Sequence, residues 1–336
     1  MPPEMLLEVS SEDGVEAITA FVNSKAVNDV TAALTAVLTT RRRGVGVRPA
    51  QTIDEETLLR SSGTGDEAEV LRLLSDPAAN PNAHIWSGYT PLHMASTHMH
   101  KAVAEVLLWS GADVAAQDTL GHTPLHRACQ RAGCTEIVKL LLKAGSDVEA
   151  RSHGSWTPLL LASREGLVEV VEVLLGERAE VDARSKDGWT PLHLASKNGF
   201  SEVVKLLLQA GANVEATGKN GWTPLHLASK NGFSEVVKLL LQAGANVEAV
   251  SKGLASTPLH VASTWGHTWV VEVLMGAGAD AKAECKALMG EARQLASSKG
   301  GEGGRKGMTP LDLAQYYRRA EVVALLSGKG RKRGGI

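Results

Sequence analysis

The sequence has few cysteines, few aromatic residues and almost no net charge. Cys129, Cys134 and Cys285 are too few, and odd in number, for a disulfide framework, which favours a reducing environment. Lys and Arg total 35 against 37 Asp and Glu, so a formal net charge of -2 gives no reason to expect nucleic acid or an anionic membrane as partner. Aromatic residues make up 4% of the chain, so Leu, Val and Ala must fill most of the core.

Long hydrophobic runs are also missing. No segment approaches the roughly 18–20 apolar residues that a membrane-spanning helix needs. The first residues carry Glu4, Glu8 and Glu12 where a secretory signal would carry Lys or Arg. We therefore expect a cytoplasmic protein, with the nucleus as an alternative because Lys329–Arg333 (KGRKR) is similar to a weak nuclear-import signal. A solvated basic tail, at 330–336, is the favoured interpretation of this basic cluster.

A repeat of 33 residues dominates what is present. Gly188–Ala216 and Gly221–Ala249 are identical over 29 residues, as expected of a tandem duplication. The tripeptide Thr-Pro-Leu recurs with gaps of 33, 34, 33, 33, 34 and 52 residues, beginning at Thr90, Thr123, Thr157, Thr190, Thr223, Thr257 and Thr309.

The duplicated unit predicts a pair of short helices. Thr190 is suited to cap the first helix and Pro191 to occupy its first position, where a missing N–H costs nothing. Gly199 ends that helix, and Ser201 is expected to cap the second with its hydroxyl. Gly211 fits the left-handed residue that closes a helix. Leu and Val at helical spacing supply apolar faces that one unit cannot bury alone, so neighbouring units must stack.

The pattern G-x-TPLH-x-A-x-x-x-G-x-x-x-x-V-x-x-LL-x-x-GA recurs from about Ser87 to Val250 and resembles the ankyrin repeat. The resemblance covers about four fifths of the chain and implies an all-α ankyrin-repeat solenoid of about eight helix-turn-helix units joined by hairpin loops. We expect a degenerate first unit at 51–86, regular units at 87–283 and a terminal unit at 307–329. An insertion at about 284–306 is either a tolerated loop extension or a projection that contacts a partner.

The first fifty residues lie outside the repeat. Val15, Ile18 and Val22, and then Val30 and Leu34, keep helical spacing, which predicts a helical N-terminal extension followed by a linker. This segment either caps the stack or forms an armadillo-type helix pair, which it faintly resembles.

Histidine and cysteine invite a metal or catalytic interpretation. Cys129 and Cys134 form a mixed cluster with His122 and His126, but a packing role suits them better than a zinc site, since the usual second ligand pair is missing. The family resemblance implies a structural role for five histidines, each tied to its own turn by hydrogen bonds: His93, His126, His193, His226 and His260.

No motif for phosphate binding, metalloprotease chemistry or a nucleophile elbow is present. We therefore expect no catalysis, no cofactor and no metal. A site in the first fifty residues or the insertion is the alternative, although those segments hold almost no His, Cys or clustered acid.

By the resemblance, two sets of positions face the concave groove of the stack. The residues before each Thr-Pro-Leu are Tyr89, His122, Trp156, Trp189, Trp222, Ser256 and Met308. From these and from the residues before each corner Gly, the candidate partner-binding residues are Tyr89, Trp156, Trp189, Lys197, Asn198, Trp222, Lys230, Asn231 and Trp265.

Recurrent Trp predicts a binding face, because Trp is enriched among interface hot spots. The alternative is that each indole packs over its own hairpin. Trp189 and Trp222 count as one observation, since duplication copied the residue. Trp109 and Trp269 fall on second helices and are expected to be packing residues.

These observations predict a monomeric, non-catalytic protein-interaction module that acts as a scaffold or adaptor for one or more proteins. The alternative is a substrate-receptor or regulatory subunit of an enzyme complex, such as a ubiquitin ligase or a phosphatase.

Overall fold

The computed structural model describes residues 52–84, 87–286 and 307–328. Within these ranges the secondary structure consists of helices without strands, arranged as eight successive pairs, so the predicted all-α solenoid is confirmed. The pairs are α4 (Thr52–Thr64) with α5 (Glu67–Leu74), α6 (Pro91–Thr97) with α7 (Lys101–Trp109), α8 (Pro124–Ala128) with α9 (Thr135–Lys143), α10 (Pro158–Glu165) with α11 (Val168–Gly176), α12 (Pro191–Asn198) with α13 (Ser201–Gln209), α14 (Pro224–Asn231) with α15 (Ser234–Gln242), α16 (Pro258–Trp265) with α17 (Thr268–Gly276), and α19 (Pro310–Tyr316) with α20 (Ala320–Leu326).

The Thr-Pro-Leu-His box starts the first helices α6, α8, α12, α14 and α16 as its chemistry requires. In α12 the hydroxyl oxygen of Thr190 accepts from the backbone N–H of His193, while the N–H of Thr190 donates to His193 Nδ1 at 3.2 Å. Pro191 follows at the first helical position, and Gly199 ends the helix in the left-handed region at φ 79°. This reciprocal capping box satisfies two amide groups that a helix start otherwise leaves without partners.

The second helix of the pair starts differently from the prediction. Its N-cap is Phe200 rather than Ser201, and no side chain caps it; Ser201 is the first helical residue. The Phe200 ring lies so close to the corner glycine of the preceding pair that a Cβ on Gly166 would be 2.6 Å from a ring atom. Packing between repeats therefore determines where this helix starts, and the prediction of a hydroxyl cap from Ser201 was wrong. The corner glycines are required both for their positive φ and for this close approach.

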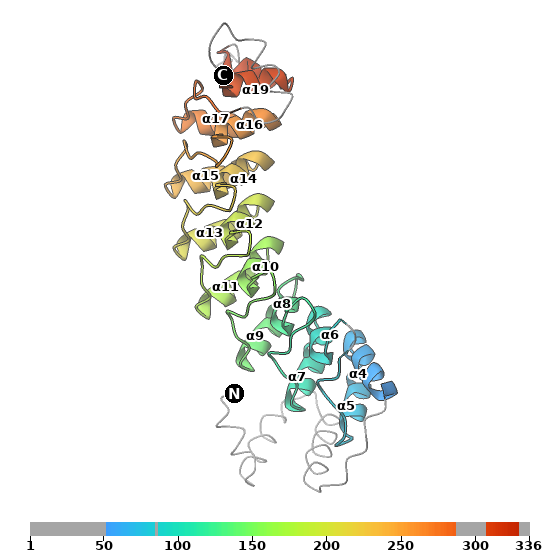
Figure 1. The fold of residues 1–336 in the computed structure, drawn as a ribbon. Coiled ribbons are helices and arrows are strands. Elements are labelled where there is room, and N and C mark those ends of the chain that lie inside the picture. The colour runs from blue at the N-terminus through green and yellow to red at the C-terminus, as the bar shows by residue number, and fades with distance from the viewer. Residues whose placement is uncertain (1–51, 85–86, 287–306, 329–336) are drawn as a thin grey trace, which may run out of the picture. The chain divides into compact units, whose positions relative to one another are not determined.

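The helices fold into two compact units. The first contains residues up to Leu161 with Gly176–Ala179, and the second contains Ala162–Leu175 with the residues from Glu180 onward. Within the first unit, α4, α6 and α8 contact one another in series, as do α5, α7 and α9. Within the second, α12, α14, α16 and α19 form one row and α13, α15, α17 and α20 the other (Figure 1). Within each of these rows, successive helices contact one another, as stacked repeats require.

Hairpins between successive pairs are linked by backbone hydrogen bonds. The N–H of Lys219 donates to the carbonyl of Asp187 at 3.1 Å, and the N–H of Lys252 donates to that of Asn220 at 3.0 Å. The predicted turn glycines Gly188 and Gly221 have φ of 76° and 68°. The hairpin tips of the second unit therefore lie in a continuous row.

Apolar side chains of both helix rows fill the core, with Leu192, Leu207 and Leu225 among those fully buried. A column of small residues runs through the first helices beside them. Ser196 and Ser229 are fully buried, and their hydroxyl oxygens have no hydrogen-bond partner among the described residues. The same position in other repeats holds Ser62, Ser96, Cys129, Ser163 and Ser263, all of them buried.

The insertion leaves and rejoins the stack at one point. Cys285 and Met308 form an isolated antiparallel bridge, with N–H···O distances of 3.0 and 2.9 Å, and both side chains are buried. The predictions for the helical extension, for most of the insertion, for the basic tail and for the nuclear-import signal fall on residues outside the described ranges. In the part of the chain that the structure describes, no helix has the length and apolar character needed to cross a membrane.

Candidate functional site

The duplicated repeats place a Trp and a Lys together on the first helix of each pair. Trp189 comes just before α12, and His193 and Lys197 follow at intervals of four residues, so all three share one helix face. The Trp189 and His193 ring centroids are 5.5 Å apart, edge to face, and Lys197 Nζ lies 5.8 Å from the centroid of the indole. The indole thus contacts both the buried imidazole and the lysine ammonium group.

The next repeat has the same arrangement and adds a second indole. Lys230 Nζ lies 5.6 Å from the centroid of Trp222 and 5.4 Å from that of Trp265, which belongs to the following repeat. One ammonium group thus contacts two aromatic rings, which is a favourable cation–π arrangement. Trp265 is 49% exposed, whereas Trp189 and Trp222 are half-buried. We call Trp189, Lys197, Trp222, Lys230 and Trp265 the tryptophan–lysine face.

None of these indoles lies in the hydrophobic core. The backbone of Trp189 closes its hairpin, since its carbonyl accepts from Ser185 N–H at 3.0 Å and its N–H donates to Ser185 Oγ at 3.3 Å. The indoles of Trp189 and Trp222 therefore contact buried histidines and remain partly exposed to solvent. Binding by this face stays a prediction.

Asn198 and Asn231, two further candidates, already have partners inside the stack. The Asn198 amide donates to the carbonyl of Arg164 at 2.7 Å, and the Asn231 amide donates to that of Lys197 at 2.9 Å. Each therefore satisfies a C-terminal carbonyl of the preceding first helix. The sequence analysis missed this role. The recurrence of Asn directly before the corner Gly was the feature that could have indicated it.

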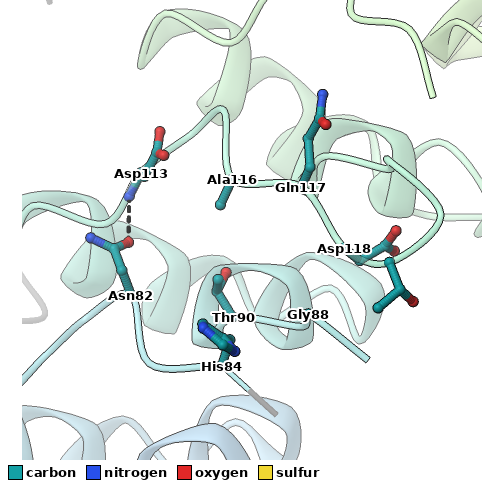
Figure 2. Close-up of a pocket in the computed structure, with 9 residues that line it drawn as sticks. Asn82, His84, Gly88, Thr90, Asp113, Ala116, Gln117 and Asp118 are labelled. Atoms are coloured by element: carbon teal, nitrogen blue, oxygen red, sulfur yellow. Dashed lines mark hydrogen bonds between the residues drawn. The ribbon is translucent and has the colours of Figure 1, made fainter. Parts of the chain in front are cut away.

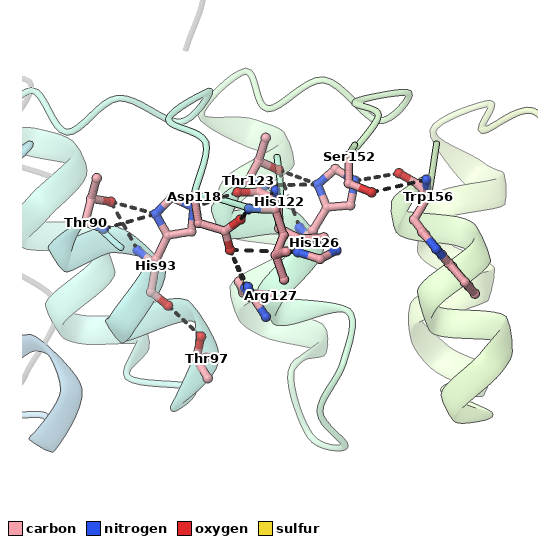
Figure 3. Close-up of polar contacts among 11 residues, drawn as sticks. Thr90, His93, Thr97, Asp118, His122, Thr123, His126, Arg127, Ser152 and Trp156 are labelled. Atoms are coloured by element: carbon pink, nitrogen blue, oxygen red, sulfur yellow. Dashed lines mark hydrogen bonds and ion pairs between the residues drawn. The ribbon is translucent and has the colours of Figure 1, made fainter. Parts of the chain in front are cut away.

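Tyr89, the candidate of the first unit, lies beside the buried ion pair of Arg127 and Asp118. Figure 3 shows this pair. The guanidinium carbon of Arg127 is 4.7 Å from the Tyr89 ring centroid, and Arg127 Nε donates to Asp118 Oδ2 at 2.9 Å. Asp118 also accepts from the backbone N–H groups of Leu120 and His122, at 2.8 and 3.0 Å. Burial alone would raise the pKa of Asp118, but these hydrogen bonds from Arg127 and the backbone outweigh it and lower the pKa.

Trp156, also in the first unit, is half-buried. Its carbonyl accepts from His126 Nε2 at 2.9 Å, and its N–H donates to Ser152 Oγ at 3.2 Å. Trp156 thus ends its hairpin as Trp189 does. Because it belongs to the first unit, the tryptophan–lysine face is defined in the second unit without it.

The five box histidines each join two repeats. His193 Nε2 lies 3.0 Å from the carbonyl of Trp222, and His226 Nε2 lies 2.9 Å from that of Ser256. The predicted structural role is therefore confirmed, and it extends beyond the turn of origin to the following repeat. Burial lowers the pKa of His193 and of His226 to about 4, although the hydrogen bonds to the carbonyls act in the opposite direction.

Four other sequence-based assignments of surface and core were wrong. Trp109 and Trp269 were expected to pack but are 45% and 70% exposed, because both lie on the outward side of their second helices. The sequence pattern placed Ser256 and Met308 in the groove, but both side chains are buried. The N–H of Ser256 donates to Ser251 Oγ, and Met308 pairs with Cys285 in the isolated bridge.

Cys129 and Cys134 are free and buried, as the packing interpretation requires. Burial raises the pKa of Cys134 to about 11 and that of Cys129 well above its usual range, so both thiols are held protonated. Cys134 is the N-cap of α9, the position that Phe200 and Phe233 hold in the duplicated repeats. Within the described ranges, no three His, Cys, Asp or Glu side chains are close enough to hold a metal ion.

A cleft of about 440 Å³ opens in the first unit, lined by Asn82, Thr90, Asp113 and Asp118 among others (Figure 2). Its polar groups already serve the stack. Asn82 Oδ1 accepts from the N–H of Asp113 at 2.7 Å, and Asp118 is paired with Arg127. The Asn82–Asp113 bond joins adjacent repeats, and the Asp118–Arg127 pair joins a hairpin to the helix α8 that follows it.

Sequence comparison agrees with this architecture. Five overlapping segments of the chain match the profile described as "Ankyrin repeats (3 copies)", at residues 58–152, 107–185, 125–218, 159–251 and 215–285. These segments cover more than half of the chain. The chain belongs to the ankyrin-repeat family.

Similar curated proteins are Notch proteins. This ankyrin-repeat chain is 40% identical over 92 residues to human neurogenic locus notch homolog protein 4, which is 27% of the chain and 4% of that protein. It is 33% identical over 110 residues to mouse neurogenic locus notch homolog protein 1, covering 31% and 4%. It is 36% identical over 97 residues to the Drosophila melanogaster Neurogenic locus Notch protein, covering 29% and 4%. The ankyrin-repeat chain thus spans about 4% of the length of these relatives.

Proposed function

We propose that this ankyrin-repeat chain is a non-catalytic scaffold or adaptor that holds a partner protein on the tryptophan–lysine face. The observation that carries the proposal is that Lys230 contacts both Trp222 and Trp265. The Trp265 side chain is 49% exposed. Trp is enriched among interface hot spots, and these indoles are partly exposed. The family supports the same conclusion, because ankyrin repeats are protein-interaction modules.

The fold supports this proposal by supplying a rigid platform. The backbones of Trp189 and Trp222 each end a hairpin, both rings contact a buried His, and the carbonyl of Trp222 accepts from His193 of the preceding repeat. A partner would therefore meet rings that are already ordered, and little conformational entropy would be lost on binding. An interface of the standard size, about 1,600 Å² in total, would need only three or four repeats.

The test is capture of cross-linked partners from the native cell, comparing the full chain with a Trp189→Ala, Trp222→Ala, Trp265→Ala variant. We expect recovery of specific partners to fall at least about tenfold, as loss of several hot-spot residues predicts. The matched control is Trp109→Ala with Trp269→Ala, which removes two exposed indoles from second helices and should leave recovery unchanged. Thermal unfolding of each variant separates lost binding from lost folding. Retained capture by a folded triple variant would contradict the proposal.

A further inference from the structure

The two helix rows of the duplicated repeats differ in how their lysines are paired. On the second helices, Lys205 lies 2.7 Å from Glu202 and Lys238 lies 3.6 Å from Glu235. On the first helices, Lys197 and Lys230 contact indole rings and have no acidic partner among the described residues. Because the two repeats are identical in sequence over this span, the same difference occurs twice. The tryptophan–lysine face therefore carries positive charge that the fold itself does not neutralise.

A second row of positive charge runs along the hairpin tips. Lys186, Lys219 and Lys252 recur at intervals of 33 residues, and all three are exposed. The backbone bonds between successive tips place them in register. Of these three lysines, only Lys219 has an ion pair with another described residue, Asp187 at 3.4 Å, and both side chains of that pair are largely exposed. Such a pair contributes little stability and is easily exchanged for another anion.

We infer that the tryptophan–lysine face binds an acidic, extended segment of a partner protein, an inference that rests on the proposed function and specifies its partner. Neighbouring helices pack about 8–10 Å apart, so Lys197 and Lys230 are expected to be separated by a similar distance. A segment in the polyproline II conformation advances about 3.1 Å per residue with three residues per turn, so every third side chain lies on one face and meets one repeat. A carboxylate at that spacing would reach each lysine, and apolar side chains between them would meet Trp189, Trp222 and Trp265.

Charge complementarity favours this occupant over single-stranded nucleic acid. Proteins that bind single strands stack bases on open aromatic faces. Here a lysine lies over the ring of Trp189 and another over that of Trp222, and the same two rings also contact His193 and His226. The indoles are thus unsuited to stacking but well placed beside a carboxylate bound to the lysine. The chain's own acidic residues Glu4, Glu8, Glu12 and Asp13 are the competing occupant.

The experiment measures fluorescence anisotropy of a labelled peptide of about 15 residues, with Glu at every third position and Leu among the others, against the full chain. The control peptide has Gln in place of each Glu. One variant carries Lys197→Gln with Lys230→Gln. Its matched control carries Lys205→Gln with Lys238→Gln, which makes the same change in net charge in the same two repeats but on the second helices.

We expect the Glu peptide to bind at least about tenfold more tightly than the Gln peptide, and to weaken as salt screens the charges. Lys197→Gln with Lys230→Gln should weaken it by about tenfold or more, and Lys205→Gln with Lys238→Gln by less than about twofold. Equal binding of both peptides, no binding at about 1 mM, or equal losses in the two variants would overturn the inference.

Two further arms exclude the other occupants. A labelled oligouridylate that binds the full chain more tightly than the Glu peptide would overturn the inference in favour of RNA. A full chain carrying Glu4→Gln, Glu8→Gln, Glu12→Gln and Asp13→Asn that binds the Glu peptide at least about tenfold better would show that this segment occupies the face. The proposed function is tested separately. If capture of a partner depends on the tryptophans but not on Lys197 and Lys230, the proposed function stands and only the inference of an acidic partner segment is overturned.

Discussion

His193 Nε2 donates a hydrogen bond to the main-chain carbonyl of Trp222, 3.0 Å away in the next repeat. The other ring nitrogen, Nδ1, accepts from the N–H of Thr190 at 3.2 Å. One neutral imidazole therefore caps the start of α12 and also bonds the backbone of Trp222 in the next repeat. Protonation of Nδ1 would place a hydrogen against the Thr190 N–H, so the arrangement depends on the neutral ring.

The pH dependence of stability follows from these histidines. Burial lowers the pKa of His126, His193 and His226 to about 4 from an ordinary 6.5. Above pH 6.5 neither state binds protons at these rings, and their contribution to stability is complete. As pH falls from 6.5 to about 4, the unfolded chain binds protons that the folded chain does not, so the free energy of unfolding falls by about 1.4 kcal/mol per pH unit for each ring. Urea titrations at pH 7, 6 and 5 measure this slope.

The control uses a substitution that the chain already contains. Leu160 occupies the box-histidine position in the repeat that begins at Thr157, and it is fully buried. His193→Leu should therefore fold and should lower the slope between pH 6 and 5 by about one proton. An identical slope in the variant would show that His193 does not titrate as its burial requires.

Asp118 and Arg127 form a buried pair that single substitution should break at large cost. The Asp118 side chain is 0% exposed and that of Arg127 is 14% exposed. Asp118→Asn leaves the guanidinium without its carboxylate, and we expect a loss of about 3 kcal/mol in the free energy of unfolding. Chemical denaturation monitored by circular dichroism measures it.

The duplicated repeat supplies the compensating variant. Ser185 and Leu194 occupy the positions of Asp118 and Arg127, and Ser185 Oγ accepts from the N–H of Trp189 as Asp118 accepts from that of His122. Asp118→Ser combined with Arg127→Leu should therefore recover most of the stability that Asp118→Asn loses, because no buried charge is left. Losses that simply add would mean that the two side chains do not interact.

The sequence predicted the helix caps and turns within each repeat better than the contacts between repeats. Thr190, Pro191 and Gly199 were assigned correctly, because capping and left-handed turns depend on residues that are adjacent in the chain. The second-helix start at Phe200 was missed because it is fixed by Gly166 in another repeat. Exposure of Trp269 was missed for the same reason, since the repeat pattern gives helix position but not how far a large side chain extends beyond its neighbours. The bond from Asn231 to Lys197 likewise requires the register between repeats.

The buried serines should be replaceable by alanine with a gain in stability. Ser196 and Ser229 are fully buried without a hydrogen-bond partner among the described residues, so each hydroxyl loses its hydration and gains no bond in return. We expect Ser196→Ala and Ser229→Ala each to raise the free energy of unfolding by about 1 kcal/mol. Ser201→Ala, at the partly exposed start of α13, should change it by less than about 0.5 kcal/mol. Destabilisation by Ser196→Ala would show that the hydroxyl has a bonded partner, such as a trapped water.

Deletion of one duplicated repeat should leave a folded stack. Removing residues 188–220 joins Asp187 to Gly221, and the next 29 residues are identical to those removed. Asn231 can then donate to Arg164 in place of Asn198, and Lys252 N–H can donate to Asp187 in place of Asn220. Because stability in a repeat stack is a sum of nearest-neighbour terms, the urea m-value should fall by about one eighth while unfolding stays cooperative.

Deletion of a repeat that has no copy is the contrasting case. Removing residues 121–154 takes out α8 and α9 together with Arg127, and it leaves Asp118 buried without its cation. Hairpin bonds such as that from His153 N–H to Leu120 are lost as well, and no identical sequence restores them. We expect this variant to lose several kcal/mol beyond one repeat's share, since an unpaired buried charge is added to the missing interface. Urea titration of the two deletion variants side by side measures the difference. Equal losses would mean that the stack tolerates any missing repeat, and that matched sequence at the new junction contributes nothing.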